Sequence, residues 1–173
     1  RLRDGVQRIP VLGTELKRWT DARVMAPLFA KLTTERRLLD VGCGSGAFLD
    51  LVRTQVGCQV EGIDISEQAV EMAQKSFGLD IFHGTIDKAP FEDESFDAIT
   101  AWWYLEHIPN PNEAVAQMSR LLRPGGTCVI GVPNSRSFWA KAFKDKWYHL
   151  DCPRHLCIWT PSTMKQLFEA QGL

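Results

Sequence analysis

Three alternating glycines form the strongest chemical signal in the sequence. Gly42, Gly44 and Gly46 directly follow the apolar run of residues 38–41. A glycine-rich turn between a strand and a helix lets the backbone approach a ligand closely and points free N–H groups at it. The glycines alone leave the ligand open, because Gly42, Gly44 and Ala47 also satisfy the dinucleotide fingerprint G-x-G-x-x-G/A.

Two acidic residues favour a positively charged nucleoside over a diphosphate. Asp40 lies at the mouth of the loop, where its carboxylate would repel a pyrophosphate but attract an ammonium group, directly or through water. Asp64 lies 18 residues beyond Gly46 and closes the next apolar run. A carboxylate there can accept hydrogen bonds from both ribose hydroxyls. The alternative for Asp64 is a charge at a helix N-terminus next to Ser66, which stabilises only the helix.

A second group of candidate residues follows a later apolar run. Trp102, Trp103 and Tyr104 are adjacent, and Glu106 and His107 come next. An aromatic face within ~6 Å of a cation attracts it by ~0.5–2 kcal/mol. The alternative is that two of the three aromatic residues pack in the core. His107 has a ring that can orient a substrate or accept its proton, and a structural role is an equal alternative.

The third group lies in residues 134–160, which are rich in aromatic residues and show no clean period. His149, Asp151, Arg154 and His155 form the pattern H-x-D-x-P-R-H-L. Polar groups this dense among aromatic residues predict a lid over a flat or amphiphilic molecule. Arg154 has two alternatives, a pair with a carboxylate or phosphate of that molecule and a pair with Asp151 that anchors the lid.

Alternating strands and helices are expected to position these groups. Short apolar runs predict strands at residues 37–41, 58–63, 79–83, 96–101 and 127–132. Helical spacing and capping residues predict helices at residues 14–33, 48–56, 66–77, 110–122 and 160–172. This alternation indicates an α/β fold of the Rossmann-like, doubly wound type, with a mostly parallel sheet and helices on both faces. Ligands of such sheets bind beyond the carboxyl ends of the strands.

Composition narrows the class of protein. The 173 residues, with 45% apolar and 24% charged side chains, suit one soluble domain. A net charge of −1 gives no reason to expect a nucleic-acid partner, and no stretch approaches the ~18 apolar residues of a membrane span. Five cysteines, an odd number, argue against a disulfide framework. We therefore expect a cytoplasmic protein; the oligomeric state stays open.

Five motifs in this order resemble those of class I methyltransferases, which use S-adenosylmethionine (SAM). They are residues 38–49, residues 62–66, Pro90-Phe91 with Phe96-Asp97, Leu105-Glu106-His107, and residues 122–126. The resemblance covers about residues 36–173. Within the family, the sequence is similar to the branch that includes ubiquinone-biosynthesis O-methyltransferases. It implies that SAM is the cofactor and that the protein methylates an oxygen or nitrogen of a small molecule. A quinone or phenol, a sugar and a lipid-linked metabolite all remain open as acceptors.

The resemblance also implies roles for individual residues. Asp40, Gly42, Gly44 and Gly46 would hold the methionine part of SAM, and Asp64 the ribose. Ile65 and Ile86 would sandwich the adenine, and Trp102 would border the methyl group. Thr85 stands where relatives often carry an aspartate that bonds the adenine, so Thr85 or Asp87 would serve there.

On the acceptor side, Trp103, Tyr104, His149 and Arg154 are expected to bind the acceptor. His155 is the preferred catalytic base and His107 the second candidate. His149, Cys152, His155 and Cys157 have spacings that zinc sites use, but they form a single cluster within the methyltransferase pattern, and we expect no metal.

The expected organisation is a single domain over residues 1–173. It comprises an N-terminal helical segment (1–35), a cofactor-binding core (36–133), the lid insertion (134–160) and a last helix (161–173). Class I methyltransferases add two further strands after that helix, and without them the fifth strand is an exposed edge. We expect the natural protein to continue past Leu173. Two alternative functions are an NAD-dependent oxidoreductase and a SAM-binding module without catalysis.

Overall fold

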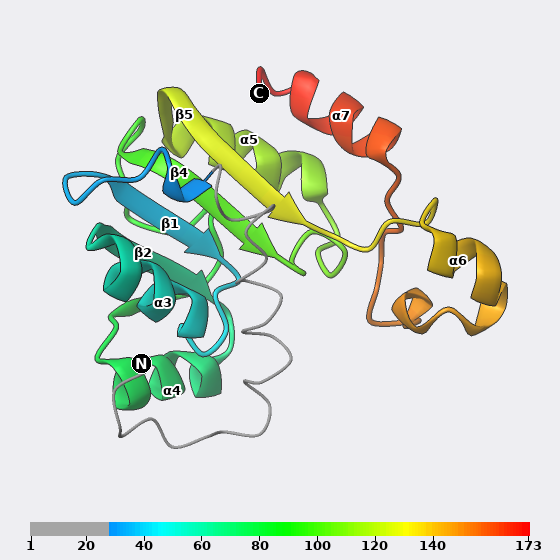
Figure 1. Cartoon of the computed structure of the whole chain (residues 1–173), viewed down its shortest axis with the longest axis horizontal. Helices are drawn as coiled ribbons and strands as arrows, with labels where there is room; N and C mark the ends of the chain where they lie inside the picture. Colours follow the sequence, from blue (N-terminus) through cyan, green and yellow to red (C-terminus); the bar gives the residue numbers. More distant parts are fainter. Residues whose placement is uncertain (1–27) are drawn as a thin grey trace.

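The computed structural model describes residues 28–173, so the predictions for residues 1–27 lie outside it. Five parallel strands form one sheet with the order β3-β2-β1-β4-β5 (Figure 1). They are β1 (Arg37–Val41), β2 (Gln59–Asp64), β3 (Ile81–His83), β4 (Phe96–Trp102) and β5 (Leu122–Gly131). The predicted α/β fold with a parallel sheet is confirmed.

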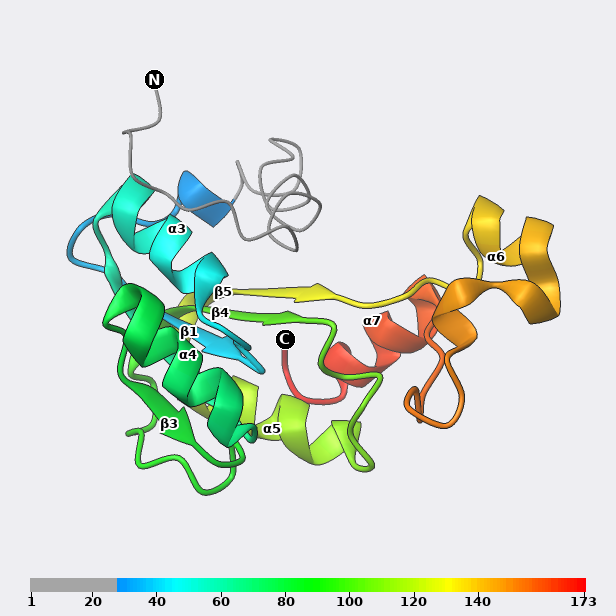
Figure 2. The ribbon, with the colours of Figure 1, turned by 90° about the horizontal axis from the view of Figure 1, so that it is seen from below.

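Helices cover both faces of the sheet. They are α3 (Ala47–Val56), α4 (Glu67–Phe77), α5 (Pro111–Leu121) and α7 (Pro161–Glu169). Figure 2 shows α3 on one side of β4 and β5, and α5 and α7 on the other. Because successive side chains of a strand point to opposite faces, Leu38 joins the apolar core under α3 and α4, while Leu39 joins the core under α5 and α7.

The helices begin where their capping residues predict. The Ser66 hydroxyl accepts a hydrogen bond from the Ala69 N–H at the start of α4. Pro111 occupies the first turn of α5, where its missing N–H costs nothing. Thr160 forms a reciprocal capping box with Thr163 at the start of α7. These local signals fix helix starts independently of the rest of the fold.

A buried carboxylate ties the amino end of the sheet together. Asp97, at the start of β4, has a side chain that is 5% exposed. Its oxygens accept hydrogen bonds from Arg36 Nη1 (2.5 Å), the Arg37 backbone N–H (2.9 Å) and Arg123 Nη1 (2.9 Å). Burial raises the pKa of Asp97, but these donors outweigh it and hold the pKa below its usual value. The carboxylate thus joins the segment before β1 to the start of β5.

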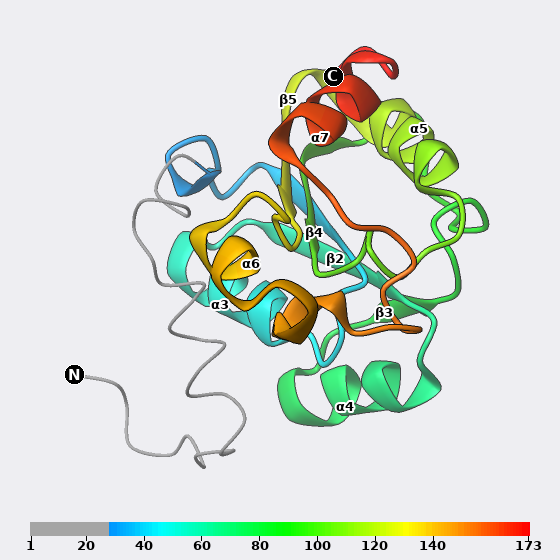
Figure 3. The same cartoon turned by 90° about the vertical axis from the view of Figure 1, so that its right-hand side faces the viewer.

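Residues 134–160 contain a helix that the sequence analysis does not predict. They form α6 (Phe138–Phe143) and two 3-10 turns at Lys144–Lys146 and Tyr148–Leu150. This segment lies beyond the carboxyl ends of the strands (Figures 1 and 3). Its role as a lid stays a prediction. No helix between residues 28 and 173 combines the length and apolarity needed to cross a bilayer.

Candidate cofactor and acceptor site

The glycine loop between β1 and α3 has left-handed backbone conformations at all three glycines. Gly42, Gly44 and Gly46 have φ angles of 71°, 55° and 76°. A Cβ atom on Gly42 would lie 2.8 Å from Tyr104 Cδ2, and one on Gly46 would lie 2.8 Å from Leu79 Cδ1. A Cβ on Gly44 would meet no atom of the described chain within 4 Å. The outer glycines therefore allow close packing, and the middle one borders open space where a ligand fits.

Asp64 connects the loop to the start of α4. Its Oδ2 accepts a hydrogen bond from the Gly44 N–H (2.8 Å), and its Oδ1 accepts one from the Ser66 N–H (2.9 Å). The bond to Ser66 is the helix-terminal role that the sequence analysis gives as an alternative. Each carboxylate oxygen can accept a further bond, so ribose hydroxyls can bind without displacing the backbone donors.

Asp40 lies beneath the loop at the end of β1 and is 2% exposed. Burial raises its pKa to about 8; a hydrogen bond from Thr100 Oγ1 to Asp40 Oδ1 (2.6 Å) opposes this rise, and the charge of Asp64 adds to it. A carboxylate with so few donors is costly to ionise. A cation at the loop would favour its charged form.

The residues expected around the adenine differ in exposure. Ile65 is 71% exposed and offers apolar surface directly after Asp64, whereas Ile86 is 3% exposed and lies in the core. The Thr85 hydroxyl donates a hydrogen bond to Asp87 and lowers the pKa of that carboxyl. The open Gly44, the Asp64 carboxylate and the exposed Ile65 fit a nucleoside. The contacts of Thr85 and Ile86 with adenine stay predictions.

Trp102, Trp103 and Tyr104 point to different surroundings. Trp102, expected next to the cofactor, packs edge-on against Phe48 of α3 with ring centroids 5.4 Å apart. Trp103 has a φ angle of 58°, which interrupts the alternation of the strand. Its ring stacks on His149 at 5.0 Å. The two residues expected to bind the acceptor, Trp103 and His149, are thus in contact.

Tyr104, also expected to bind the acceptor, lies against the glycine loop at Gly42. Burial raises its pKa to about 12, and the negative charges of Asp87 and Asp64 add to the effect. Tyr104 therefore borders the cofactor side, while its neighbour Trp103 borders the aromatic cavity described next.

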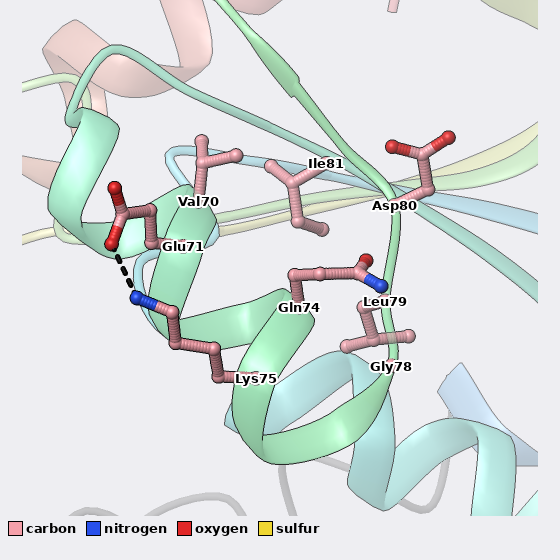
Figure 4. A pocket seen from close by; sticks show the side chains of 8 residues that line it. All are labelled: Val70, Glu71, Gln74, Lys75, Gly78, Leu79, Asp80 and Ile81. Atoms are coloured by element: carbon pink, nitrogen blue, oxygen red, sulfur yellow. Dashed lines mark hydrogen bonds and ion pairs between the residues drawn. The ribbon is translucent and has the colours of Figure 1, made fainter.

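An aromatic cavity of about 510 Å³ lies between the end of the sheet and α6. The aromatic side chains that line it are Trp103, Trp139, Phe143, Trp147, Tyr148 and His149. A second cavity of about 620 Å³ lies between α4 and the residues that precede β3. Figure 4 shows its lining side chains, with the Glu71–Lys75 ion pair along α4. That cavity lies where β3 begins, and no residue of the glycine loop lines it.

Arg154 makes the anchoring pair that the sequence analysis gives as one of two alternatives. Its Nη2 lies 2.7 Å from Asp151 Oδ1. The hydrogen bond from Arg154 lowers the pKa of Asp151. The guanidinium is otherwise exposed, so its expected contact with an acceptor stays a prediction.

The two candidate bases, His107 and His155, lie together with Glu106. Their rings meet edge to face with centroids 4.7 Å apart. Nδ1 of His107 bonds the carbonyl oxygen of Arg154 (3.1 Å), and Nδ1 of His155 bonds that of His149 (2.7 Å). The sequence analysis gives Glu106 no role, although it belongs to the Leu-Glu-His motif. About 50 residues separate the two histidines in the sequence, so their contact could not be predicted from spacing.

The zinc alternative weighed from the sequence is not the arrangement that forms. Among residues 28–173, the single group of potential metal ligands within reach of one another is Glu106, His107 and His155. It omits His149, Cys152 and Cys157 of the alternative set. His155 therefore lies with Glu106 and His107 and not with the other three residues of that set.

A Rossmann-like sheet with a glycine loop after its first strand, and acidic side chains at two strand ends, is typical of α/β domains that bind nucleosides and nucleotides. The model of a methyltransferase domain family matches residues 15–173, and the chain belongs to this SAM-dependent family. The predicted family is thus confirmed.

Individual relatives agree with this membership. The chain is 38% identical over 124 residues to a ubiquinone biosynthesis O-methyltransferase of Thiobacillus denitrificans, covering 68% of this chain and 50% of that protein. It is 35% identical over 99 residues to a demethylmenaquinone methyltransferase of Staphylococcus aureus, covering 54% and 41%. A SAM-dependent methyltransferase of Archaeoglobus fulgidus shares the fold, with a TM-score of 0.74, 22% identity, and coverage of 95% and 74%. The chain spans about half the length of the curated relatives it matches.

Proposed function

We propose that this domain binds SAM and transfers its methyl group to a hydroxyl of an aromatic small molecule. The observation that carries the proposal is the arrangement of two adjacent residues. Tyr104 lies against the glycine loop, and Trp103 lines the aromatic cavity. A nucleoside on the loop and a ring in the cavity would thus meet at one short segment after β4.

The cofactor would be held by groups already aligned for it. Gly44 leaves room for close approach, and Asp64 has free lone pairs beside it. Asp40 would bond the ammonium group of the methionine part, directly or through water, and Ile65 would pack on the adenine. When bound, SAM supplies a methyl group on a positively charged sulfur.

An aromatic acceptor fits the cavity better than a sugar or an aliphatic lipid headgroup. Trp103, Trp139 and Trp147 are among the side chains that line it, and flat rings pack on such surfaces. The names of two similar enzymes, ubiquinone biosynthesis O-methyltransferase and demethylmenaquinone methyltransferase, support a quinone-type ring, and the first also names oxygen as the methylated atom. We therefore place oxygen before nitrogen as the methylated atom.

Catalysis would depend mainly on positioning. Holding the acceptor oxygen in line with the methyl carbon supplies most of the rate. As the oxygen–carbon bond forms, the carbon–sulfur bond breaks with its electron pair on sulfur. The acceptor proton leaves toward the group of Glu106, His107 and His155, where a base is worth ~10²–10⁴-fold.

The test is calorimetry followed by turnover. SAM and its demethylated product should bind with one site per chain, and NAD should not. A panel of phenols, hydroquinones and sugars, assayed for methyl transfer from SAM, should give methylated products with the aromatic compounds. Trp103→Ala should lower turnover, whereas Phe138→Ala, an exposed residue outside the cavity lining, should not.

The contrary results separate the alternatives. Binding of NAD in place of SAM would indicate an oxidoreductase and contradict the proposal. Binding of SAM without turnover on any of the panel would favour a SAM-binding module. Methylation restricted to sugars would overturn the assignment of the acceptor class.

A further inference from the structure

Glu106 is a buried carboxylate whose oxygens accept no hydrogen bond from the part of the chain that the structure describes. It lies just after β4 and is 0% exposed. Neither carboxylate oxygen has a hydrogen-bond partner among residues 28–173. An ionised carboxylate out of water costs several kcal/mol unless a proton or a cation compensates it.

The neighbouring histidines add acceptors rather than donors. A carbonyl oxygen can only accept, so the Nδ1 atoms of His107 and His155 carry the hydrogens in their bonds to the Arg154 and His149 carbonyls. In a neutral imidazole the other nitrogen, Nε2, then has a free lone pair. The group thus brings two imidazoles and one carboxylate together, with one potential ligand atom from each within 4.8 Å of the others. Nε2 of His155 also lies 3.9 Å from Asp151 Oδ2.

The hydrogen bonds from Nδ1 of His107 and His155 to backbone carbonyls are of the kind that metal-binding histidines make. A histidine that ligates a metal usually donates its other ring N–H to a carbonyl or carboxylate, which fixes the tautomer and the ring orientation. Both histidines meet this condition. Two imidazoles and one carboxylate are also the ligand set of catalytic zinc sites, where a fourth position stays open.

The backbone holds the group in place. The Glu106 carbonyl accepts hydrogen bonds from the N–H groups of Leu156 (2.7 Å) and Cys157 (3.2 Å). With the bond from His107 to Arg154, three bonds therefore join the segment after β4 to the segment around His155. His107 is exposed, which leaves a path for an ion from solvent.

We infer that Glu106, His107 and His155 bind a divalent cation of the zinc type through the Glu106 carboxylate and the two Nε2 atoms. Nitrogen-rich sets favour zinc and its neighbours over magnesium. Binding requires a modest contraction, since ligand atoms around zinc lie roughly 3.3 Å apart. The open position would take the acceptor hydroxyl, whose proton would pass to solvent water as the metal-bound oxygen ionises.

The catalytic part of this inference rests on the proposed function, but metal binding does not. In this assignment the two histidines act on the acceptor through the cation instead of taking its proton directly. Metal binding can therefore be measured without SAM and without an acceptor.

The first test is titration of the metal-free protein with zinc sulfate by calorimetry, and with Co²⁺ by visible absorption. We expect one ion per chain and the d–d bands of a site with nitrogen and oxygen ligands. Glu106→Gln and His155→Ala should each weaken binding by more than ~100-fold, beyond the effect of losing an outer hydrogen bond. His83→Ala, whose ring bonds the Ile65 carbonyl, and Cys152→Ser, an exposed thiol, are the matched controls and should bind as wild type does.

Thermal unfolding separates a lost ligand from a lost fold. Metal-free Glu106→Gln should melt no lower than metal-free wild type, because it removes an uncompensated buried carboxylate. Zinc should raise the Tm of wild type but not of Glu106→Gln, since only wild type gains a ligand of the folded state. A wild-type protein that binds no stoichiometric zinc, or zinc binding that survives both substitutions, would overturn the site. Methyl transfer that persists after chelation would overturn its catalytic role and leave the proposed function standing.

Discussion

A buried carboxylate lies near each end of β4, and the two carboxylates differ in how many hydrogen bonds they accept. At the amino end, Asp97 accepts hydrogen bonds from two guanidinium groups and a backbone N–H. Beyond the carboxyl end, Glu106 is equally buried and accepts none at its side chain among the described residues. Asp40, at the carboxyl end of the adjacent β1, is intermediate, with a bond from the Thr100 hydroxyl.

At the amino end of the sheet the buried carboxylate stabilises the fold through its donors. At the carboxyl end the buried carboxylates have few donors, as expected where a ligand binds. A satisfied carboxylate contributes to folding, whereas one without donors needs a proton, a ligand or a cation to offset its burial. The same division follows from the general position of binding sites at the carboxyl ends of parallel strands. Substitutions at the two ends should therefore change different measured quantities.

The largest effect is expected from Asp97→Ala. It removes three hydrogen bonds at the amino end and should lower the free energy of unfolding by about 3 kcal/mol in urea titrations. SAM affinity should stay unchanged. Because the folded pKa of Asp97 lies below its usual 3.8, this stabilisation is present above that pH and is lost as pH falls through the folded value.

Asp93→Ala is the control for Asp97→Ala. Asp93 is exposed and pairs with Arg120 alone, so its removal should cost less than about 1 kcal/mol. Equal losses for the two substitutions, or a loss of SAM affinity in Asp97→Ala, would remove the distinction between the two ends.

A smaller effect on the free energy of unfolding is expected when the pH is raised and Asp40 loses its proton. Its pKa of about 8 in the folded protein exceeds the usual 3.8, so the folded state holds a proton that the unfolded state has lost. The stability of the cofactor-free protein should therefore fall as pH rises through this window, by up to about 1.4 kcal/mol per unit. Between pH 6 and pH 8 we expect a fall of about 2 kcal/mol.

Asp40→Asn should flatten this slope, because the amide oxygen can still accept from Thr100 and carries no charge. Chemical denaturation at a series of pH values measures it. A wild-type protein whose stability is level between pH 6 and pH 8 would show that Asp40 is compensated without a ligand.

The smallest difference is expected between two glycines of the loop. Gly46→Ala introduces a left-handed alanine that also crowds Leu79 and Ala73, and should cost about 2 kcal/mol of stability. Gly44→Ala introduces the same backbone strain without a contact, so it should cost about 1 kcal/mol.

For SAM affinity we expect the opposite order, with a greater loss in Gly44→Ala than in Gly46→Ala. The methyl group of Gly44→Ala would occupy the space left for the ligand, so calorimetry should show the greater loss of affinity there. Matching losses of affinity in both variants would mean that Gly44 does not border the cofactor.

Much of the fold could be predicted because local signals determine it. The run at residues 37–41, the hydroxyl of Ser66 and the pair Asn110-Pro111 each mark an element boundary without help from distant residues. The start of β5 was predicted at residue 127, but the strand begins at Leu122. Pairing with Phe96 extends it across a proline and two glycines that read as a turn.

The candidate site was predictable only in part. The glycine loop and Asp64 follow one another along the chain, so their contact could be expected. The different directions of Trp102 and Tyr104 depend on the left-handed backbone at Trp103, which the residue type disfavours. The group of Glu106 and His155 arises from hydrogen bonds between segments about 50 residues apart, which no spacing rule reveals.

The bonds from Leu156 and Cys157 to the Glu106 carbonyl have a consequence for how an acceptor reaches the cavity. They fasten one flank of residues 134–160 to the sheet, whereas α6 carries exposed aromatic side chains at Phe138, Trp139 and Phe143. If residues 134–160 act as the predicted lid, α6 would move while the flank that carries His155 stays bonded to the segment after β4. Acceptor size would be limited by how far that helix travels, and the geometry at Glu106 would be preserved through each cycle.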